Sequence, residues 1–480
     1  MINSSLIKSI QDIMRKDAGV DGDAQRISQM AWMIFLKVFD DKEKEADAIN
    51  EKYKSPMPPA LRWRVWAEND EGITGEELLD FINNKLFKEL KELEVDESDD
   101  PRKFLIKAIF EDSFNYMKNG TLIRQVINKL NEIDFNKSED RHLFNDIYEK
   151  ILSDLQSAGN AGEFYTPRAV TQFIVDMVNP KLGEKILDPA CGTGGFLVSC
   201  IENIRDSVKT TEQRKILQES IRGVEKKSMP HLLGVTNLIL HDIEVPNIKH
   251  GNTLTRNVRE FSAEEKVDVV VTNPPFGGKE MAGIQANFPT LLRGSETADL
   301  FLVLIMHILR DGGRCGIVLP DGSLFGEGVK TRIKEKLLSE FNLHTIVRLP
   351  NGVFNPYTGI RTNLLFFTKG ENTKEVWYFE HPLPEGYKTY NKSKPIKISE
   401  FDLEKEWWND RDNEKFKKNC WKVSIEDIEK KNYNLDISNP NNGNSAKNFT
   451  SKELLEKIKE NLNNTSILFE NIEREINNGK

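Results

Sequence analysis

The sequence has no long hydrophobic run. Its longest apolar stretches, residues 30–36 and 300–306, are seven residues each, whereas a membrane-spanning helix needs roughly 18 or more apolar residues. Charged residues between Lys8 and Asp17 interrupt the apolar core that a secretory signal peptide requires near this end of a chain. We therefore expect a cytoplasmic protein with no membrane partner.

Cysteine is scarce and scattered. The four cysteines, Cys191, Cys200, Cys315 and Cys420, form no Cys-x-x-Cys pair and have no histidine at metal-ligand spacing. The pattern therefore indicates neither a disulfide framework nor a zinc site, and we expect reduced thiols in a reducing compartment.

Positive charge is not in surplus. The 67 Lys and Arg residues are outnumbered by 76 Asp and Glu residues, which gives a formal net charge of −9. A protein that binds DNA alone usually carries a basic surplus, because much of its affinity comes from neutralising phosphates. If DNA is the substrate, a local basic patch or another subunit must supply much of the affinity.

The length of 480 residues exceeds what one compact core supports, so two or three domains are expected. Residues 1–155 predict an all-helical N-terminal domain, because apolar residues between Ile27 and Val38 recur on one helical face. Further segments share this periodicity: 75–93, 100–109, 120–133 and 140–155.

Residues 156–438 predict an α/β domain, because short apolar strands alternate with helical stretches. Strands joined by helices imply a Rossmann-like fold with a mostly parallel sheet and ligand-binding loops at the carboxyl ends of its strands. The expected strands are 185–187, 221–224, 267–271, 315–319, 343–348 and 364–367.

Residues 439–480 predict a linker followed by a C-terminal helix. Apolar positions recur there with steps of 3 and 4, which is a heptad seam broken only by Thr465. Such a helix either docks on its own domain or packs against a helix of a partner. The seam positions are Leu455, Ile458, Leu462, Thr465, Phe469, Ile472 and Ile476.

A glycine-rich loop directly follows the first expected strand, at residues 188–197 (DPACGTGGFL). Its glycines permit positive φ and a close approach of the backbone to a ligand. Leu197 stands where a dinucleotide-binding loop has its last glycine, and no GxxxxGK[ST] motif is present. Asp188 would oppose a pyrophosphate but suits a ligand with an α-amino group and a sulfonium.

Two further segments are candidates for ligand binding. Glu225 ends the next expected strand, where a carboxylate commonly accepts two ribose hydroxyls; the alternative is a solvated glutamate. Residues 162–168 (GEFYTPR) precede a helix that starts at Ala169. Thr166 and Pro167 fit the cap and first turn of that helix. Alternatively, Phe164 or Tyr165 contacts a cofactor and Thr166 lies near its carboxylate.

The most specific motif lies at residues 268–277 (DVVVTNPPFG), where an apolar strand ends at Asn273-Pro274-Pro275-Phe276. Two prolines cannot continue an interior strand, so they form a rigid turn at the carboxyl edge of the sheet. The Asn273 side-chain oxygen and the Pro274 carbonyl can accept both hydrogens of an aromatic amino group and draw its nitrogen toward tetrahedral geometry. Phe276 can stack on a base flipped out of a duplex.

This corner predicts methylation of an exocyclic amino group by direct in-line transfer from S-adenosylmethionine, with no covalent enzyme intermediate. No Pro-Cys dipeptide is present, so the nucleophile of cytosine-C5 methylation is absent. A rigid structural turn is the alternative interpretation. The later residues 355–357 (NPY) lack the second proline and a preceding apolar strand, so a loop is expected there.

Taken together, these motifs resemble the modification (M) subunits of type I restriction-modification systems, which are adenine-N6 DNA methyltransferases. The resemblance covers nearly the whole chain. Besides the loop and the corner described above, it rests on residues 31–37 (AWMIFLK), 163–168 (EFYTPR), Glu225, 237–241 (NLILH) and 349–354 (LPNGVF), in the order of the family.

The resemblance implies a catalytic corner at Asn273, Pro274, Pro275 and Phe276, and a bound S-adenosylmethionine with no metal. Asn252 departs from the family, since many adenine methyltransferases place an aspartate there near the adenine ring of the cofactor. The implied cofactor contacts are Glu163, Phe164, Tyr165, Thr166, Pro167, Arg168, Asp188, Thr193, Gly194, Gly195, Glu225 and Asn252.

The resemblance also implies partners: DNA, a specificity (S) subunit bound by two M subunits, and a restriction (R) subunit for cleavage. Two alternatives remain at this point. The same chemistry serves methyltransferases of protein glutamine or rRNA, which are typically shorter. The second alternative is a non-catalytic assembly subunit that binds the cofactor for structural reasons. The intact corner at residues 273–276 argues against it.

The heptad seam generates a first prediction. The interpretation that the seam packs against a partner helix predicts that deleting residues 450–480 disrupts assembly with the S subunit without unfolding the α/β domain. Size-exclusion chromatography of the mixed subunits checks assembly, and circular dichroism of the truncated chain checks folding. Unchanged complex formation would overturn the assignment.

Overall fold

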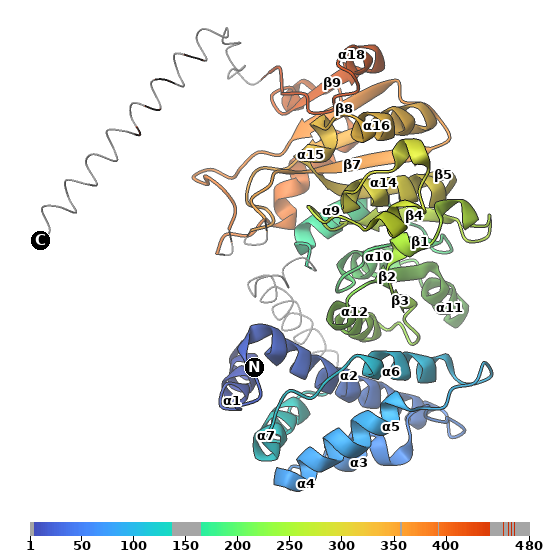
Figure 1. Cartoon of the computed structure of the whole chain (residues 1–480), viewed down its shortest axis with the longest axis vertical. Helices are drawn as coiled ribbons and strands as arrows, with labels where there is room; N and C mark the ends of the chain where they lie inside the picture. Colours follow the sequence, from blue (N-terminus) through green and yellow to red (C-terminus); the bar gives the residue numbers. More distant parts are fainter. Residues whose placement is uncertain are drawn as a thin grey trace, which may run out of the picture.

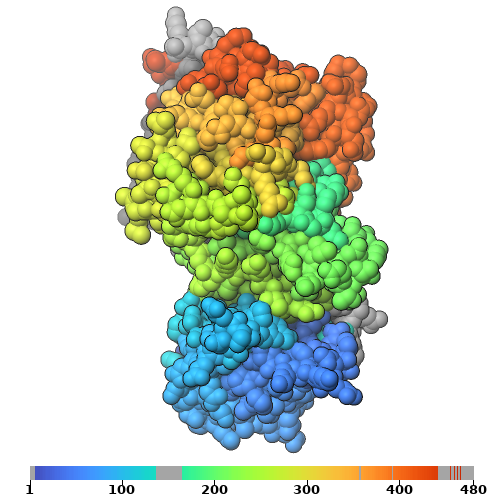
Figure 2. Space-filling model, turned by 90° about the vertical axis from the view of Figure 1, so that its right-hand side faces the viewer, coloured from blue at the N-terminus to red at the C-terminus, as the bar shows by residue number. Residues whose placement is uncertain are grey.

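The computed structural model describes most of the chain, and Figures 1 and 2 show its blue N-terminal helices at one end and the remaining chain beyond them. No helix within these described stretches is both long and apolar enough to cross a membrane. The described residues are 4–136, 165–355, 358–391 and 393–441, with positions 455, 459, 462 and 465.

Helices are the regular elements of residues 4–136, and their core gathers around the buried rings of Trp32, Phe35, Trp63 and Phe110. The expected segment at 120–133 begins where the Asn119 side chain caps the helix. The expected segment at 140–155 lies outside the described residues. The helices are α1 (Ser4–Met14), α2 (Gly22–Ile49), α3 (Trp63–Trp66), α4 (Gly75–Asp80), α5 (Phe87–Lys91), α6 (Pro101–Glu111) and α7 (Gly120–Asn131), with a π-helix, η2 (Phe81–Leu86), joining α4 to α5.

A nine-stranded sheet follows, in the order β3-β2-β1-β4-β5-β7-β6-β8-β9. It is mostly parallel, but β7 runs antiparallel to β5 and β6, and β9 to β8. The α/β fold and all six expected strands are confirmed, whereas β3, β8 and β9 were not expected. The strands are β1 (Ile186–Asp188), β2 (Ile221–Glu225), β3 (Ile248–His250), β4 (Val267–Thr272), β5 (Leu309–Pro320), β6 (Phe341–Arg348), β7 (Thr362–Lys369), β8 (Glu375–Glu380) and β9 (Cys420–Ser424).

Helices connect these strands (Figure 1), and all of them except α13 bury apolar residues. α14 is apolar on nearly every side and is correspondingly buried along most of its length. The helices are α9 (Arg168–Val178), α10 (Gly195–Arg205), α11 (Thr211–Ser220), α12 (Ser228–Leu240), α13 (Ala282–Gln285), α14 (Thr297–Ile308), α15 (Asp321–Phe325), α16 (Val329–Glu340), α17 (Asp402–Asn409) and α18 (Ile425–Lys430).

The strand order reverses at β1. The chain proceeds from β1 through β2 to β3 on one side and then returns to place β4 on the other side of β1. Loops that leave the carboxyl ends of strands flanking such a reversal diverge and leave a crevice, which is where open α/β sheets bind ligands. The glycine loop after β1 and the corner after β4 therefore border the same crevice.

The helical part and the α/β part meet mainly where α2 packs against α12. Lys42 Nζ lies 2.9 Å from Asp242 Oδ1, and the Ser228 hydroxyl donates to Asp112 at 3.2 Å. Of the C-terminal seam, Leu455 and Leu462 are helical and exposed; Ile458, Phe469, Ile472 and Ile476 lie outside the described residues.

The close approach of α9 to β5 generates a prediction about stability. A Cβ on Gly316 would stand 2.5 Å from Ile174 Cγ2 and 2.8 Å from Val178 Cγ2. We expect Gly316→Ala to cost about 1–3 kcal/mol by overpacking, which lowers Tm by roughly 2–4 °C per kcal/mol. Gly322→Ala is the matched control, because nothing lies within 4 Å of its added Cβ. Equal melting temperatures in calorimetry would contradict this packing.

Candidate functional site

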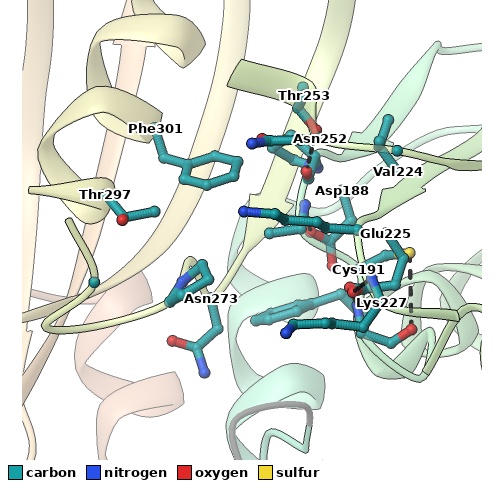
Figure 3. A pocket seen from close by; sticks show the side chains of 18 of the residues that line it. Asp188, Cys191, Val224, Glu225, Lys227, Asn252, Thr253, Asn273, Thr297 and Phe301 are labelled. Carbon is teal, nitrogen blue, oxygen red and sulfur yellow. Dashed lines mark hydrogen bonds between the residues drawn. The ribbon is translucent and has the colours of Figure 1, made fainter. Parts of the chain in front are cut away.

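A cavity of about 240 Å³ opens at the crevice. Loops after β1, β2, β3 and β4 line it together with α14, and Figure 3 shows Asn273 on one side with Glu225 and Lys227 on the other. The predicted site residues that line the cavity are Thr166, Asp188, Thr193, Gly195, Glu225, Asn252, Asn273 and Pro275.

The glycine loop turns the chain from β1 into α10 through two residues with positive φ, Gly192 (+53°) and Gly194 (+79°). A Cβ on Gly194 would stand 3.1 Å from Leu238 Cδ1, so a side chain there is both strained and crowded. The Asn237 side chain donates to the Thr193 carbonyl at 2.9 Å, which anchors the loop to α12. The loop is thus held open toward the cavity by its neighbours.

Asp188 ends β1 and is only 1% exposed, although it lines the cavity. Its Oδ1 accepts hydrogen bonds from the Ala190 backbone N–H at 3.1 Å and from the Thr272 hydroxyl at 2.7 Å. Burial raises the pKa of Asp188 to about 7, in opposition to these two hydrogen bonds. A carboxyl in this state is stabilised as an anion by any cation that enters the cavity.

Glu225 ends β2 and is buried at 6% exposure. Its oxygens accept hydrogen bonds from the backbone N–H groups of Gly192 (2.9 Å) and Lys227 (2.6 Å). Burial raises its pKa despite these bonds. The alternative interpretation, a solvated glutamate, is therefore wrong. Each carboxylate oxygen has two lone pairs, so both retain the capacity to accept a hydroxyl from a ligand.

Asn273 follows β4 directly, and its side-chain amide has one partnered and one unpartnered polar atom. Its Nδ2 donates to the Thr166 hydroxyl at 3.0 Å. Its Oδ1 is buried and has no hydrogen-bond partner in the described part of the chain. A buried acceptor without a donor costs about 1–3 kcal/mol, and a ligand N–H placed at this oxygen would recover that cost.

The structure contradicts one of the two interpretations of the segment before α9, namely that Thr166 caps the helix. α9 begins at Arg168 with Pro167 in the cap position, and no side chain caps it. The expectation that Thr166 caps this helix is therefore wrong, because its hydroxyl is taken by the Asn273 amide. Arg168 Nη1 donates to the Gly195 carbonyl at 2.6 Å. Glu163 and Phe164 lie outside the described residues.

The remaining predicted residues among those described do not line the cavity. Pro274 is buried and Tyr165 is half-buried against the core. Phe276 is also half-buried, and its ring meets the edge of the Phe354 ring at a centroid distance of 6.4 Å. Gly194 acts through the shape of the loop. The corner therefore presents Asn273 and Pro275 to the cavity, with Phe276 directed toward another loop.

Asn252 lines the cavity at the start of a short 3-10 helix, η4 (Thr253–Thr255), where its Oδ1 accepts from the Leu254 N–H at 3.0 Å. Figure 3 shows the Phe301 ring entering the cavity from the opposite side, where Thr297 and Asn273 are also drawn. Sequence reasoning missed Phe301 and Thr297, which both line it. Their spacing of four residues places them on one face of α14, but this apolar helix carries no sequence signal that separates the face toward the cavity from the faces packed in the core.

Lysines at the cavity were also missed. Lys226, Lys227 and Lys279 are exposed residues that line it, in a chain whose overall charge is negative. Among the described residues, one ion pair involves these three lysines: Lys226 lies 4.0 Å from Glu280. They form a local basic rim beside two buried acidic groups.

Comparison with known proteins agrees with this geometry. The model of the family N-6 DNA Methylase matches residues 139–449, and that of the HsdM N-terminal domain matches residues 3–130. The methylase subunit of the type I restriction enzyme EcoEI from Escherichia coli is 60% identical over 446 residues, which is 92% of this chain and 91% of that protein.

Solved structures give the same result. A modification subunit assigned to a type I restriction enzyme from Vibrio vulnificus is 44% identical with a TM-score of 0.83, over 92% of this chain and 98% of that one. A chain from a structure of type I restriction-modification complex assembly is 37% identical with a TM-score of 0.81, over 99% of both chains. This chain therefore belongs to the N-6 DNA methylase family, as a member of its type I methylase subunits.

Proposed function

We propose that this chain transfers the methyl group of S-adenosylmethionine to the N6 amino group of adenine in DNA, as the modification subunit of a type I restriction-modification complex. The observation that carries the proposal is the buried, unpartnered Oδ1 of Asn273 at the edge of the cavity. The family membership and the 60% identical methylase subunit support the substrate.

Asn273 acts on the nucleophile. The lone pair of an adenine amino group is delocalised into the ring, so the nitrogen is a poor nucleophile until it becomes tetrahedral. Asn273 Oδ1 would accept one amino hydrogen, and the Pro274 carbonyl would accept the other. Since Oδ1 lacks a donor beforehand, this bond forms without displacing an existing one. Placement of the amino group supplies most of the acceleration.

The residues of the cavity fit the cofactor. Asp188 is a buried carboxyl that a cation would stabilise, and Glu225 retains acceptor capacity for the two ribose hydroxyls. Thr193 and Gly195 line the cavity and would contact the cofactor from the glycine loop. When bound, S-adenosylmethionine supplies a methyl group already activated by its sulfonium, so the reaction needs no metal.

The target adenine must leave the duplex to reach this cavity, since its amino group lies inside the helix. Phe276 is the aromatic surface nearest to Asn273 along the chain and would stack on the flipped base. Lys226, Lys227 and Lys279 would bind phosphates near the cavity mouth. Three lysines do not offset a net charge of −9, so a partner must provide most of the DNA affinity.

The partner is proposed to be a specificity subunit that reads the sequence and binds two copies of this chain, with a restriction subunit joining for cleavage in the cytoplasm. The structure of type I complex assembly that resembles this chain supports such an assembly. We propose the division into a helical domain (1–155), a methyltransferase domain (156–438) and an assembly segment (439–480). No observation favours the glutamine, rRNA or non-catalytic alternatives.

Substitution of Asn273 tests the catalytic assignment. Asn273→Ala removes the acceptor and should lower kcat/KM about 10²–10³-fold, while cofactor affinity persists. Asn273→Asp keeps a side-chain oxygen and should retain much more activity than Asn273→Ala. The measurement is methylation of DNA by the complex with the specificity subunit, with the modified base located by methylation-aware sequencing. Wild-type rates for Asn273→Ala would refute the assignment.

The pH dependence of cofactor binding tests Asp188. Its pKa of about 7 means that the carboxylate, the form that attracts a cation, is present above pH 7 and lost below it. S-adenosylmethionine should therefore bind roughly tenfold more weakly at pH 6 than at pH 8. Asp188→Asn is the control, since it removes this titration and leaves those of Glu225 and of the cofactor. Identical pH profiles for the two proteins in calorimetry would contradict the role.

A further inference from the structure

A buried hydrogen-bonded cluster lies beyond β8, in a region to which the proposed mechanism gives no role. His381 Nδ1 lies 2.5 Å from Glu404 Oε1, and His381 Nε2 lies 3.2 Å from the Tyr390 hydroxyl. That hydroxyl donates to Glu400 Oε2 at 2.6 Å. His381, Tyr390 and Glu404 are almost fully buried. We name these four residues the support cluster.

The backbone beside Tyr390 holds the loop at residues 349–355. The Tyr390 N–H donates to the Asn351 carbonyl at 3.4 Å, and the Tyr390 carbonyl accepts from the Asn355 side chain at 3.1 Å. The Thr389 hydroxyl adds a bond to the Asn351 carbonyl at 2.9 Å. Gly352 has φ of +87°, and a Cβ there would stand 2.3 Å from the Tyr390 carbonyl oxygen. The fit between loop and segment is therefore tight.

This loop carries Phe354 to the catalytic corner. Phe354 is 1% exposed, and its ring meets that of Phe276 at 6.4 Å with an interplanar angle of 73°. Phe276 is half-buried and outside the cavity wall. The Phe354 ring is therefore an aromatic contact through which the loop can influence the orientation of the Phe276 ring.

The same segment supports the other side of Asn273. Phe401, next to Glu400, stacks on Phe173 of α9 at 4.4 Å with an interplanar angle of 11°. Lys405 Nζ binds Asp176 Oδ2 of α9 at 2.6 Å. The residue just before the cap of α9 is Thr166, which holds the Asn273 amide. Both neighbours of the corner, α9 and the 349–355 loop, thus rest on the segment that contains the support cluster.

We propose that Tyr390 is a positioning residue for methyl transfer. Held by His381 and Glu400, it fixes the 349–355 loop so that Phe354 orients the Phe276 ring toward the flipped base. Removal of its hydroxyl deprives the buried His381 ring and the half-buried Glu400 carboxylate of a hydrogen-bond partner, which favours a shift of the segment. The inference rests on the proposed function, since it assumes that Phe276 contacts the target base.

The test is a double-mutant cycle in the complex with the specificity subunit. Tyr390→Phe should lower kcat about tenfold with the KM for S-adenosylmethionine unchanged, because the cofactor contacts are intact. Tyr387→Phe, the same change in the neighbouring tyrosine, should stay within twofold of wild type. If Tyr390 acts through Phe276, adding Tyr390→Phe to Phe276→Leu should cause no further loss.

Two outcomes overturn the inference: a wild-type kcat for Tyr390→Phe, or losses that multiply in the double variant. Phe354→Leu leaves the support cluster intact and should reproduce both the loss in kcat and its non-additivity with Phe276→Leu. It keeps the test decisive if Tyr390→Phe fails to fold. A wild-type complex that methylates no adenine would instead refute the proposed function, so the two failures are distinguished in one assay.

Discussion

Because β2 and β3 lie on one side of β1 and β4 lies on the other, the loops that leave β1 and β4 diverge over a single crevice. The hydrogen bond from Thr272 to Asp188, at 2.7 Å, ties the ends of these two strands together. The carboxyl suited to the cofactor and the amide suited to the substrate are therefore set by adjacent strands. The pairing of β1 with β4 in the sheet therefore fixes the distance between these two groups.

The crevice concentrates groups that are costly to bury. Asp188 and Glu225 are buried carboxyls whose pKa values are raised by burial, and Asn273 carries an acceptor without a donor. Such costs persist only where the surrounding structure enforces them, and they decrease when a ligand supplies the missing partners. A cation for Asp188, hydroxyls for Glu225 and an amino hydrogen for Asn273 are complementary to these groups.

Much of the fold was predictable because β1, β4, β5 and β7 contain short apolar runs, while β2 and β6 alternate apolar and polar residues. β3 is three residues long with two exposed, so it has no clear pattern. β8 has a run of four apolar residues (VWYF) between two glutamates, but that run was missed because the surrounding stretch is polar. The site residues divide in the same way, into those that a local sequence pattern indicates and those that depend on contacts between distant parts of the chain. Asp188 and Glu225 sit at strand ends, but the Thr166 hydroxyl binds an amide 107 residues away, which local capping rules cannot anticipate.

The corner motif does not by itself determine the geometry of the reacting amino group. Thr166 holds the Asn273 amide from before α9, Asp188 holds the strand end through Thr272, and Phe354 meets Phe276 from the loop after β6. These supports come from three regions of the chain, and the first and last of them rest on the segment around Tyr390 and Phe401. The Asn273–Phe276 tetrapeptide also occurs in enzymes that act on other amino groups. Its position here is fixed by contacts from the whole α/β domain, so the resemblance to the family depends on all the motifs in order and not on the tetrapeptide alone.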